Sequence, residues 1–117
     1  YIFAQENPLR NATGIIDRLD NVPDGYRPDA LSMIQFLERF YEEQNIRFSP
    51  NKIVAALWLA GRMGKHGVTQ KQLVKSSGNT SSERGIREQI REMKRFFGLS
   101  REELYGMSVS DFTNGAY

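Results

Sequence analysis

The chain of 117 residues contains no cysteine and only one histidine, His66. The lack of cysteine excludes disulfide bonds, a thiol nucleophile and a zinc site built from thiolates. A single histidine likewise excludes a metal site made of histidines alone. We therefore expect a domain without a cofactor and without a bound metal ion.

Long apolar runs are absent too. No stretch approaches the roughly 18 consecutive apolar residues of a transmembrane helix, and the N-terminus does not resemble a secretion signal. The sequence predicts a soluble intracellular protein that does not interact with a membrane. Because the chain starts with Tyr1 rather than Met, we expect it to be a fragment or a processed chain.

Groups arranged for catalysis are also missing. Two carboxylate pairs, Asp17 with Asp20 and Glu42 with Glu43, stand without a partner residue or a glycine-rich loop beside them. His66 lies in a glycine-flanked turn, where a surface residue is the more common case than a general base or ligand. We predict that the protein is not an enzyme and has no small-molecule substrate.

Basic residues are concentrated in one part of the chain. Residues 62–101 hold ten basic and three acidic residues, a net charge of +7, although the whole chain carries only +2. A concentration of this kind is typical of a surface that binds phosphate. The alternative is a solvated helix face rich in Arg and Lys. The apolar content of 39% is enough for one core in one domain.

The stretch from Ser49 to Arg62 organises the rest of the chain. Ser49 is a favourable N-cap, and Pro50 suits the first helical position, where no N–H is needed. Residues 53–60 are all apolar, so the sequence predicts a helix that is buried on every side. Trp58 is expected in the core rather than on a ligand-binding surface.

Four further helices are predicted from periodicity and caps. One runs from Pro8 to near Asp20, and a second from Pro28 with one buried side. A capping box from Thr69 to Gln72 opens a helix of two turns that Gly78 ends. The next helix buries Ile86, Ile90, Met93 and Phe97 and closes at Gly98.

The C-terminal residues follow a second capping box, Ser100 to Glu103, which predicts a short helix through Tyr105. Residues 107–117 are expected to be loosely ordered, with Phe112 or Tyr117 as an anchor. No segment predicts a strand, so the expected fold class is all-α.

Residues from Thr69 to Phe97 form a candidate helix-turn-helix. In this motif the second helix enters the major groove, and flanking basic or short polar residues hold phosphates. Arginines at offsets of three and four place a cationic stripe on the second helix. The predicted DNA-binding residues are Gln70, Lys71, Lys75, Thr80, Ser81, Ser82, Arg84, Arg87, Arg91 and Lys94.

Several of these segments together resemble the cyclin-type repeat of the transcription factor IIB family, most closely its second repeat. The resemblance covers roughly Pro8 to Gly98, and it is carried by Ser49-Pro50, Ala55-Ala56-Leu57-Trp58-Leu59-Ala60, Gly64, Thr69-Gln70-Lys71-Gln72-Leu73, Gly78, Ile86-Arg87 and Ile90-Arg91-Glu92-Met93. It implies a cyclin-like five-helix domain over residues 1–98, with a central third helix, followed by a short helix and tail over residues 99–117.

The same resemblance implies a function in transcription initiation. The fourth and fifth helices would bind double-stranded promoter DNA beside a TATA element, in a complex with TATA-binding protein, with RNA polymerase left open as a further partner. The protein would be cytoplasmic in an archaeon and nuclear in a eukaryote.

The sequence departs from the family at the recognition helix, which often reads Val-Thr-Ile-Arg. Ile86 and Arg87 match its last two positions, whereas Arg84 and Gly85 replace Val and Thr. Arg87 is therefore the best candidate for a base contact. The loop before it is about two residues longer than usual. A zinc ribbon and a second repeat would lie upstream of Tyr1, or the chain is a shortened relative.

Two other functions fit the same residues. A cyclin-like adaptor would bind protein partners in an apolar groove between its first helices and the central helix, without contacting DNA. A helical repressor of another family would self-associate and bind a palindromic site.

Overall fold

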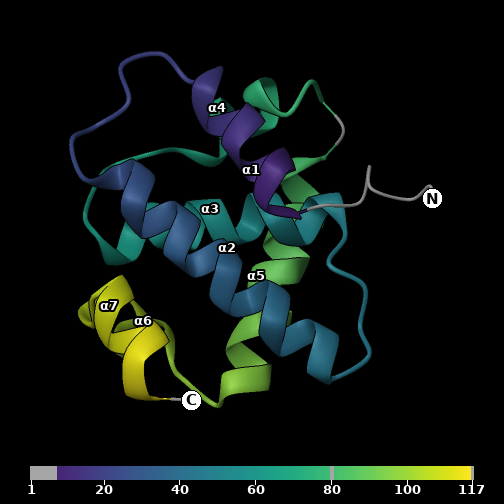
Figure 1. Cartoon of the computed structure of the whole chain (residues 1–117), viewed down its shortest axis with the longest axis vertical. Helices are drawn as coiled ribbons and strands as arrows, with labels where there is room; N and C mark the ends of the chain where they lie inside the picture. The colour runs from purple at the N-terminus through teal and green to yellow at the C-terminus, as the bar shows by residue number, and fades with distance from the viewer. Residues whose placement is uncertain (1–7, 80, 117) are drawn as a thin grey trace.

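The computed structural model describes residues 8–79 and 81–116, which fold into helices joined by short connections (Figure 1). No strand occurs among these residues, so the predicted all-α class is confirmed. The helices are α1 (Pro8–Asp17), α2 (Tyr26–Glu43), α3 (Pro50–Met63), α4 (Gln70–Ser76), α5 (Glu83–Phe97), α6 (Arg101–Gly106) and α7 (Val109–Asp111), with a π-helical turn, η2 (Phe112–Ala116).

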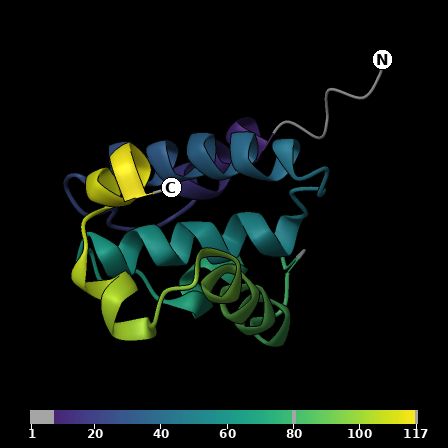
Figure 2. The same cartoon turned by 90° about the horizontal axis from the view of Figure 1, so that it is seen from below.

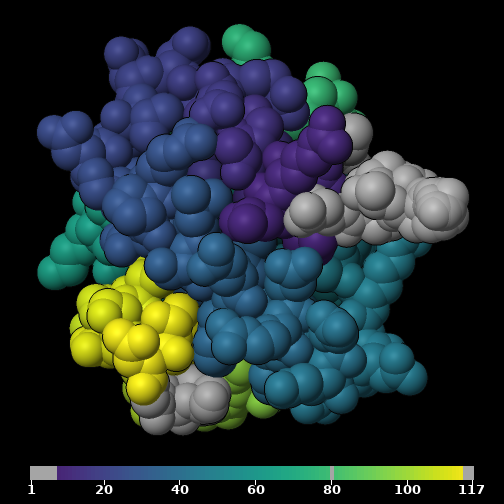
Figure 3. Space-filling view, in the orientation of Figure 1, coloured from purple at the N-terminus to yellow at the C-terminus, as the bar shows by residue number. Residues whose placement is uncertain are grey.

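The predicted central helix is α3. It lies between α2 on one side and α5 on the other (Figure 2), and α1, α4 and α6 also contact it. From the α1 and α2 side, these two helices cover most of α3 (Figure 3). The chain therefore has three layers, with the candidate recognition helix in an outer one.

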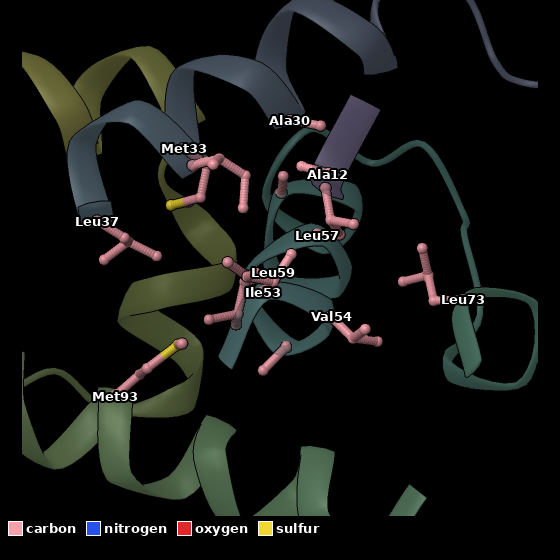
Figure 4. Close-up of a cluster of buried hydrophobic side chains, with 14 of the residues drawn as sticks. Ala12, Ala30, Met33, Leu37, Ile53, Val54, Leu57, Leu59, Leu73 and Met93 are labelled. Carbon is pink, nitrogen blue, oxygen red and sulfur yellow. The ribbon is translucent and has the colours of Figure 1, made fainter. Parts of the chain in front are cut away.

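Burial of α3 follows from its composition. Its residues Ile53, Val54 and Leu57 are at most 2% exposed, and side chains from α1, α2, α4 and α5 surround them (Figure 4). Truncation of one fully buried Leu to Ala costs about 2–5 kcal/mol. A Tyr26 hydroxyl also donates a hydrogen bond of 3.0 Å to the Leu57 carbonyl, which ties α2 to this helix.

Trp58 differs from its prediction, because its side chain is only partly buried. Its cover is the short helix α6, whose Tyr105 ring lies edge-on to it with centroids 5.9 Å apart. The Arg62 guanidinium lies over both rings, 5.6 Å from the Trp58 centroid and 4.9 Å from that of Tyr105. Trp58, an apolar α3 side chain that is only partly buried, is therefore a contact between α3 and α6.

Most predicted helix ends are confirmed. Thr69 and Ser100 both form complete capping boxes. Gly78 and Gly98 both have left-handed backbone, with φ of 73° and 63°. This is the conformation for which glycine is favoured at a helix end.

Two predicted ends are wrong, and one predicted cap lacks its hydrogen bond. The first helix stops at Asp17 rather than near Asp20. The second begins at Tyr26 instead of Pro28, because the first N–H groups of a helix have no intrahelical acceptor and a proline in the first turn costs nothing there. Ser49 flanks α3 as expected, but its side chain makes no capping hydrogen bond.

The C-terminal residues are more ordered than predicted over the part that the structure describes. Val109 and Phe112 are buried, at 1% and 3% exposure. The Phe112 ring contacts Phe36 of α2 and Phe97 of α5, with centroids 5.2 and 5.0 Å apart. Phe112 is thus an anchor as predicted, whereas Tyr117 lies outside the described residues.

Candidate nucleic-acid interface

The two helices of the candidate motif, α4 and α5, are in contact and are joined by residues 77–82. One side of α5 packs against α3 through the predicted apolar residues Ile86, Ile90, Met93 and Phe97, which are all buried. Since these residues fix the rotation of α5 about its axis, they also fix which of its side chains face solvent.

A cationic stripe runs along the solvent side of α5, formed by Arg84, Arg87, Arg91, Lys94 and Arg95. The four arginines are exposed, and Lys94 is partly exposed. Among the described residues, Arg87 and Arg91 form no salt bridge. Their guanidinium groups are thus available to an anion, and a planar guanidinium can donate two parallel hydrogen bonds to one phosphate or one guanine.

Arg84 is the exception within the stripe, because it pairs with Glu88 one turn later. Their closest nitrogen and oxygen atoms are 3.5 Å apart, and the side chains are 86% and 59% exposed. Exposed pairs of this spacing stabilise a helix by only about 0.3–0.5 kcal/mol. A phosphate could therefore replace Glu88 as the partner of Arg84 at little cost.

The connection between the helices uses its hydroxyl groups for structure. Ser82 is the N-cap of α5, and its oxygen accepts a 3.0 Å hydrogen bond from the Gly85 amide. Ser81 is only 6% exposed, and its hydroxyl has no hydrogen-bond partner. Thr80 lies outside the described residues. Three residues of this connection were predicted to bind DNA. Among the described ones, only Ser82 is exposed at the surface.

The predicted residues of α4 lie near the surface. Lys71 and Lys75 are exposed, and Gln70 is partly exposed. Gln70 is the first residue of the helix, directly after the Thr69 cap. The lysines add positive charge to the helix that would cross the DNA backbone in a helix-turn-helix.

Gly85 allows α5 to approach α3 closely at the start of the recognition helix. A Cβ atom at this position would lie 2.6 Å from Nδ2 and 3.0 Å from Cγ of Asn51 in α3. Any side chain at residue 85 would therefore require Asn51 to move. Asn51 thus occupies the space that a threonine at residue 85 would need.

Arg18 joins α1 to the candidate motif, which the sequence did not indicate. Its Nε donates a 2.7 Å hydrogen bond to the carbonyl of Ser76, the last residue of α4. A cation at a helix C-terminus is favourable because it interacts with unpaired carbonyl groups. The only sequence signal was a basic residue near the end of a helix, which does not identify its acceptor.

His66 is not the surface residue that its turn predicted. Its side chain is 11% exposed, and Nε2 lies 2.9 Å from Oδ2 of Asp29 in α2. The ring also packs edge-on against Tyr26 at a centroid distance of 5.5 Å. This contact connects the segment before α4 to the start of α2, and its role is structural.

Burial and hydrogen bonds shift three pKa values. Burial raises the pKa of Tyr26 and that of Tyr41, and the Glu92 carboxylate adds to the rise at Tyr41. Backbone and then side-chain hydrogen bonds from Ser100 lower the pKa of Glu103 at its capping box. None of these groups belongs to the cationic stripe.

The described residues contain no cluster of three or more acidic or histidine side chains able to hold a metal ion. Nor does any helix there combine the length and apolarity needed to cross a membrane. Of the large apolar side chains in this part of the chain, only Val22 and Phe96 are exposed, at 37% and 40%.

No family model matches the chain, and no curated protein or solved structure matches it.

Proposed function

We propose that this chain is the DNA-binding core domain of a transcription initiation factor of the transcription factor IIB type. In this proposal the domain has the five-helix cyclin-like arrangement, α1 to α5, and α5 enters the major groove of promoter DNA next to TATA-binding protein. RNA polymerase is a further partner in the same proposal.

The exposed cationic stripe on α5 is the observation that carries the proposal. Arg87 and Arg91 project from the outer side of a helix whose inner side is fixed by buried apolar residues. The preceding short helix α4 contacts α5 and adds Lys71 and Lys75 at the surface. A two-helix unit of this kind supplies both a groove-reading helix and phosphate contacts.

The adaptor function has less support. Its partner groove would be lined by apolar residues of α1 and α2 facing α3, but Ile16, Ile34 and Leu37 are each at most 1% exposed. Because these side chains are already packed in the core, we favour the DNA-binding function.

Duplex binding measured by fluorescence anisotropy tests the proposal. The probe is a labelled TATA-flanking duplex, titrated in a series of salt concentrations with and without TATA-binding protein. Arg87→Ala and Arg91→Ala should each weaken binding without unfolding the domain, and each lost phosphate contact should reduce the log–log salt slope by about 0.9. A base contact at Arg87 would instead appear as a loss of discrimination worth about 1–3 kcal/mol.

Arg39→Ala is the charge-matched control. Arg39 is an exposed arginine of α2, in the layer on the other side of α3, so its removal should leave affinity and salt slope unchanged. Binding that does not depend on salt, or no binding at any salt concentration with TATA-binding protein present, would contradict the proposal. A dimer bound to a palindromic duplex would indicate the repressor instead.

A further inference from the structure

A cavity of about 350 Å³ lies where α1 passes the start of α3 and the end of α4. Its lining includes Arg10 and Gly14 of α1, Arg18 directly after that helix, Pro50 of α3, and Ser77 just after α4. Two of the described lining residues are cationic and none is acidic. Guanidinium groups in a concave site favour an anionic ligand, and phosphate matches their donor geometry.

Gly14 keeps this cavity open. Arg10, Gly14 and Arg18 are spaced four residues apart, so they lie along one side of α1. A Cβ atom at residue 14 would meet only the Arg18 guanidinium, at 3.6 Å from its nearest nitrogen. The two terminal nitrogens of Arg18 thus lie over Gly14, while its Nε is bonded to the Ser76 carbonyl. The glycine weakens the helix by up to about 1 kcal/mol relative to alanine, but it leaves space between the two arginines.

The start of α3 adds positive potential to the same cavity. Pro50 lines it and has no N–H, and the Ser49 side chain makes no capping hydrogen bond to the first turn. The N-terminus of a helix carries a partial positive charge from its unpaired amides. In this 14-residue helix that charge acts together with the Arg18 guanidinium.

The start of α3, which lines the cavity, also packs against the start of α5, on the flank of α5 away from the cationic stripe. Asn51, the neighbour of Pro50, faces Gly85 near the start of α5. A helix in the major groove lies between two phosphate backbones. One backbone would meet the side that carries Arg87 and Arg91, and the other would pass the flank at Gly85.

We propose that this cavity binds one phosphate of the DNA backbone, on the strand opposite to the one that meets the cationic stripe. The inference rests on the proposed function and extends the DNA interface from the helix-turn-helix to α1. Arg18 then has two roles, since it contacts the phosphate and also holds the end of α4.

Salt-dependent anisotropy with the TATA-flanking duplex tests the cavity through two variants and one control. Arg18→Gln removes the guanidinium charge of Arg18. Gly14→Glu places a carboxylate in the cavity, and it should not weaken α1, because glutamate favours a helix more than glycine does. Both should weaken binding about tenfold at 0.1 M salt and reduce the log–log salt slope by about 0.9, the value for one phosphate. Arg39→Gln, at an exposed arginine of α2 that does not line the cavity, is the control and should leave the slope unchanged.

A second measurement separates the phosphate sources. Titration of the free protein with inorganic phosphate, followed by amide NMR shifts, should move the signals of α1 and the start of α3 at millimolar concentrations, because a lone ion lacks the other contacts of a duplex. If phosphate binds there but the duplex slope is the same in Arg18→Gln and Gly14→Glu as in the unmodified chain, the site serves a free anion and the duplex assignment is overturned.

Failure of this inference can be distinguished from failure of the proposed function. If Arg87→Ala weakens binding while Gly14→Glu changes neither affinity nor slope, the cavity is not part of the interface and the proposed function stands. If the unmodified chain binds no duplex, both proposals are overturned. Should Arg18→Gln unfold through loss of its Ser76 bond, Gly14→Glu alone decides.

Discussion

A double-mutant cycle between Gly85 and Asn51 tests the packing that sets the recognition helix against α3. Replacing glycine by alanine in a helix normally stabilises it by up to about 1 kcal/mol. At residue 85, however, the new Cβ would lie 2.6 Å from Nδ2 of Asn51, and overpacking of this kind costs about 1–3 kcal/mol. Gly85→Ala should therefore lower the free energy of unfolding, by up to about 2 kcal/mol.

Removing the Asn51 side chain should reverse the sign of the effect of Gly85→Ala on the free energy of unfolding. Asn51 Oδ1 is buried without a hydrogen-bond partner, so Asn51→Ala loses contacts but also removes an unsatisfied polar atom, and we expect a change within about 1 kcal/mol. In that background the close approach no longer exists. Gly85→Ala should then stabilise the domain by up to about 1 kcal/mol, giving a coupling energy of about 1–3 kcal/mol.

Urea denaturation of the four proteins, followed by far-UV circular dichroism, supplies the free energies. All four should unfold with the same m-value, because the exposed surface hardly changes. The reasoning is refuted if Gly85→Ala stabilises the original chain as much as it stabilises the Asn51→Ala variant. Additive effects would mean that the two helices are not in close contact at this point.

Three further predictions concern stability and charge. Above pH 10 the free energy of unfolding should fall by about 2.7 kcal/mol per pH unit, because Tyr26 and Tyr41 ionise in the unfolded chain while burial raises the pKa of both in the fold. Below pH 10 this contribution to stability is fully present. In urea titrations at several pH values, Tyr26→Phe should halve the slope of the free energy against pH. Gly64→Ala should destabilise the domain by about 1–3 kcal/mol, since its Cβ would lie 2.5 Å from Cδ2 of His66 and 2.7 Å from Oδ2 of Asp29. A cost that persists when both His66 and Asp29 are replaced by Ala would contradict this cause. Glu88→Gln should leave thermal stability nearly unchanged but tighten duplex binding severalfold, because it removes a negative charge and the ion-pair partner of Arg84 from the cationic stripe. Weaker binding of this variant in the anisotropy assay would count against the proposed interface.

Local sequence signals were sufficient to predict most of the helices. Residues 53–60 contain no polar residue, a run that is also compatible with a buried strand. The Ser49-Pro50 pair before the run and its alanines indicated a helix instead, with neighbours on all sides. The capping boxes at Thr69 and Ser100 and the glycine stops at Gly78 and Gly98 are likewise local, since each is completed within about four residues. The exposed arginines of α5 followed from the same reasoning, because the four buried residues of that helix fix its outer face.

The sequence could not predict contacts that depend on tertiary packing. Nothing near His66 in the chain identifies Asp29, which is 37 residues away. The bond from Arg18 to the Ser76 carbonyl spans 58 residues. Ser81 was expected at the surface because serine is polar, yet the packing of the turn buries it. The tail was expected to be loose because it has few helix signals, whereas Phe112 is fixed by aromatic rings from α2 and α5.

The distribution of charge explains why the formal net charge says little about this protein. Residues 1–61, which include α2, carry eight acidic and six basic residues, whereas residues 62–101 carry a net charge of +7. The helices α2 and α5 lie on opposite sides of α3 (Figure 2), and the domain is 26 Å across in its shortest dimension. At physiological ionic strength the Debye length is about 8 Å, so an approaching polyanion interacts with only one of these faces. The α5 face should therefore attract a duplex as strongly as a much more basic protein would, while the α2 face does not. In the proposed function, this asymmetry orients the domain before any base is contacted. Lengthening the Debye length to about 30 Å at 0.01 M salt would weaken that orientation, because both faces would then act together.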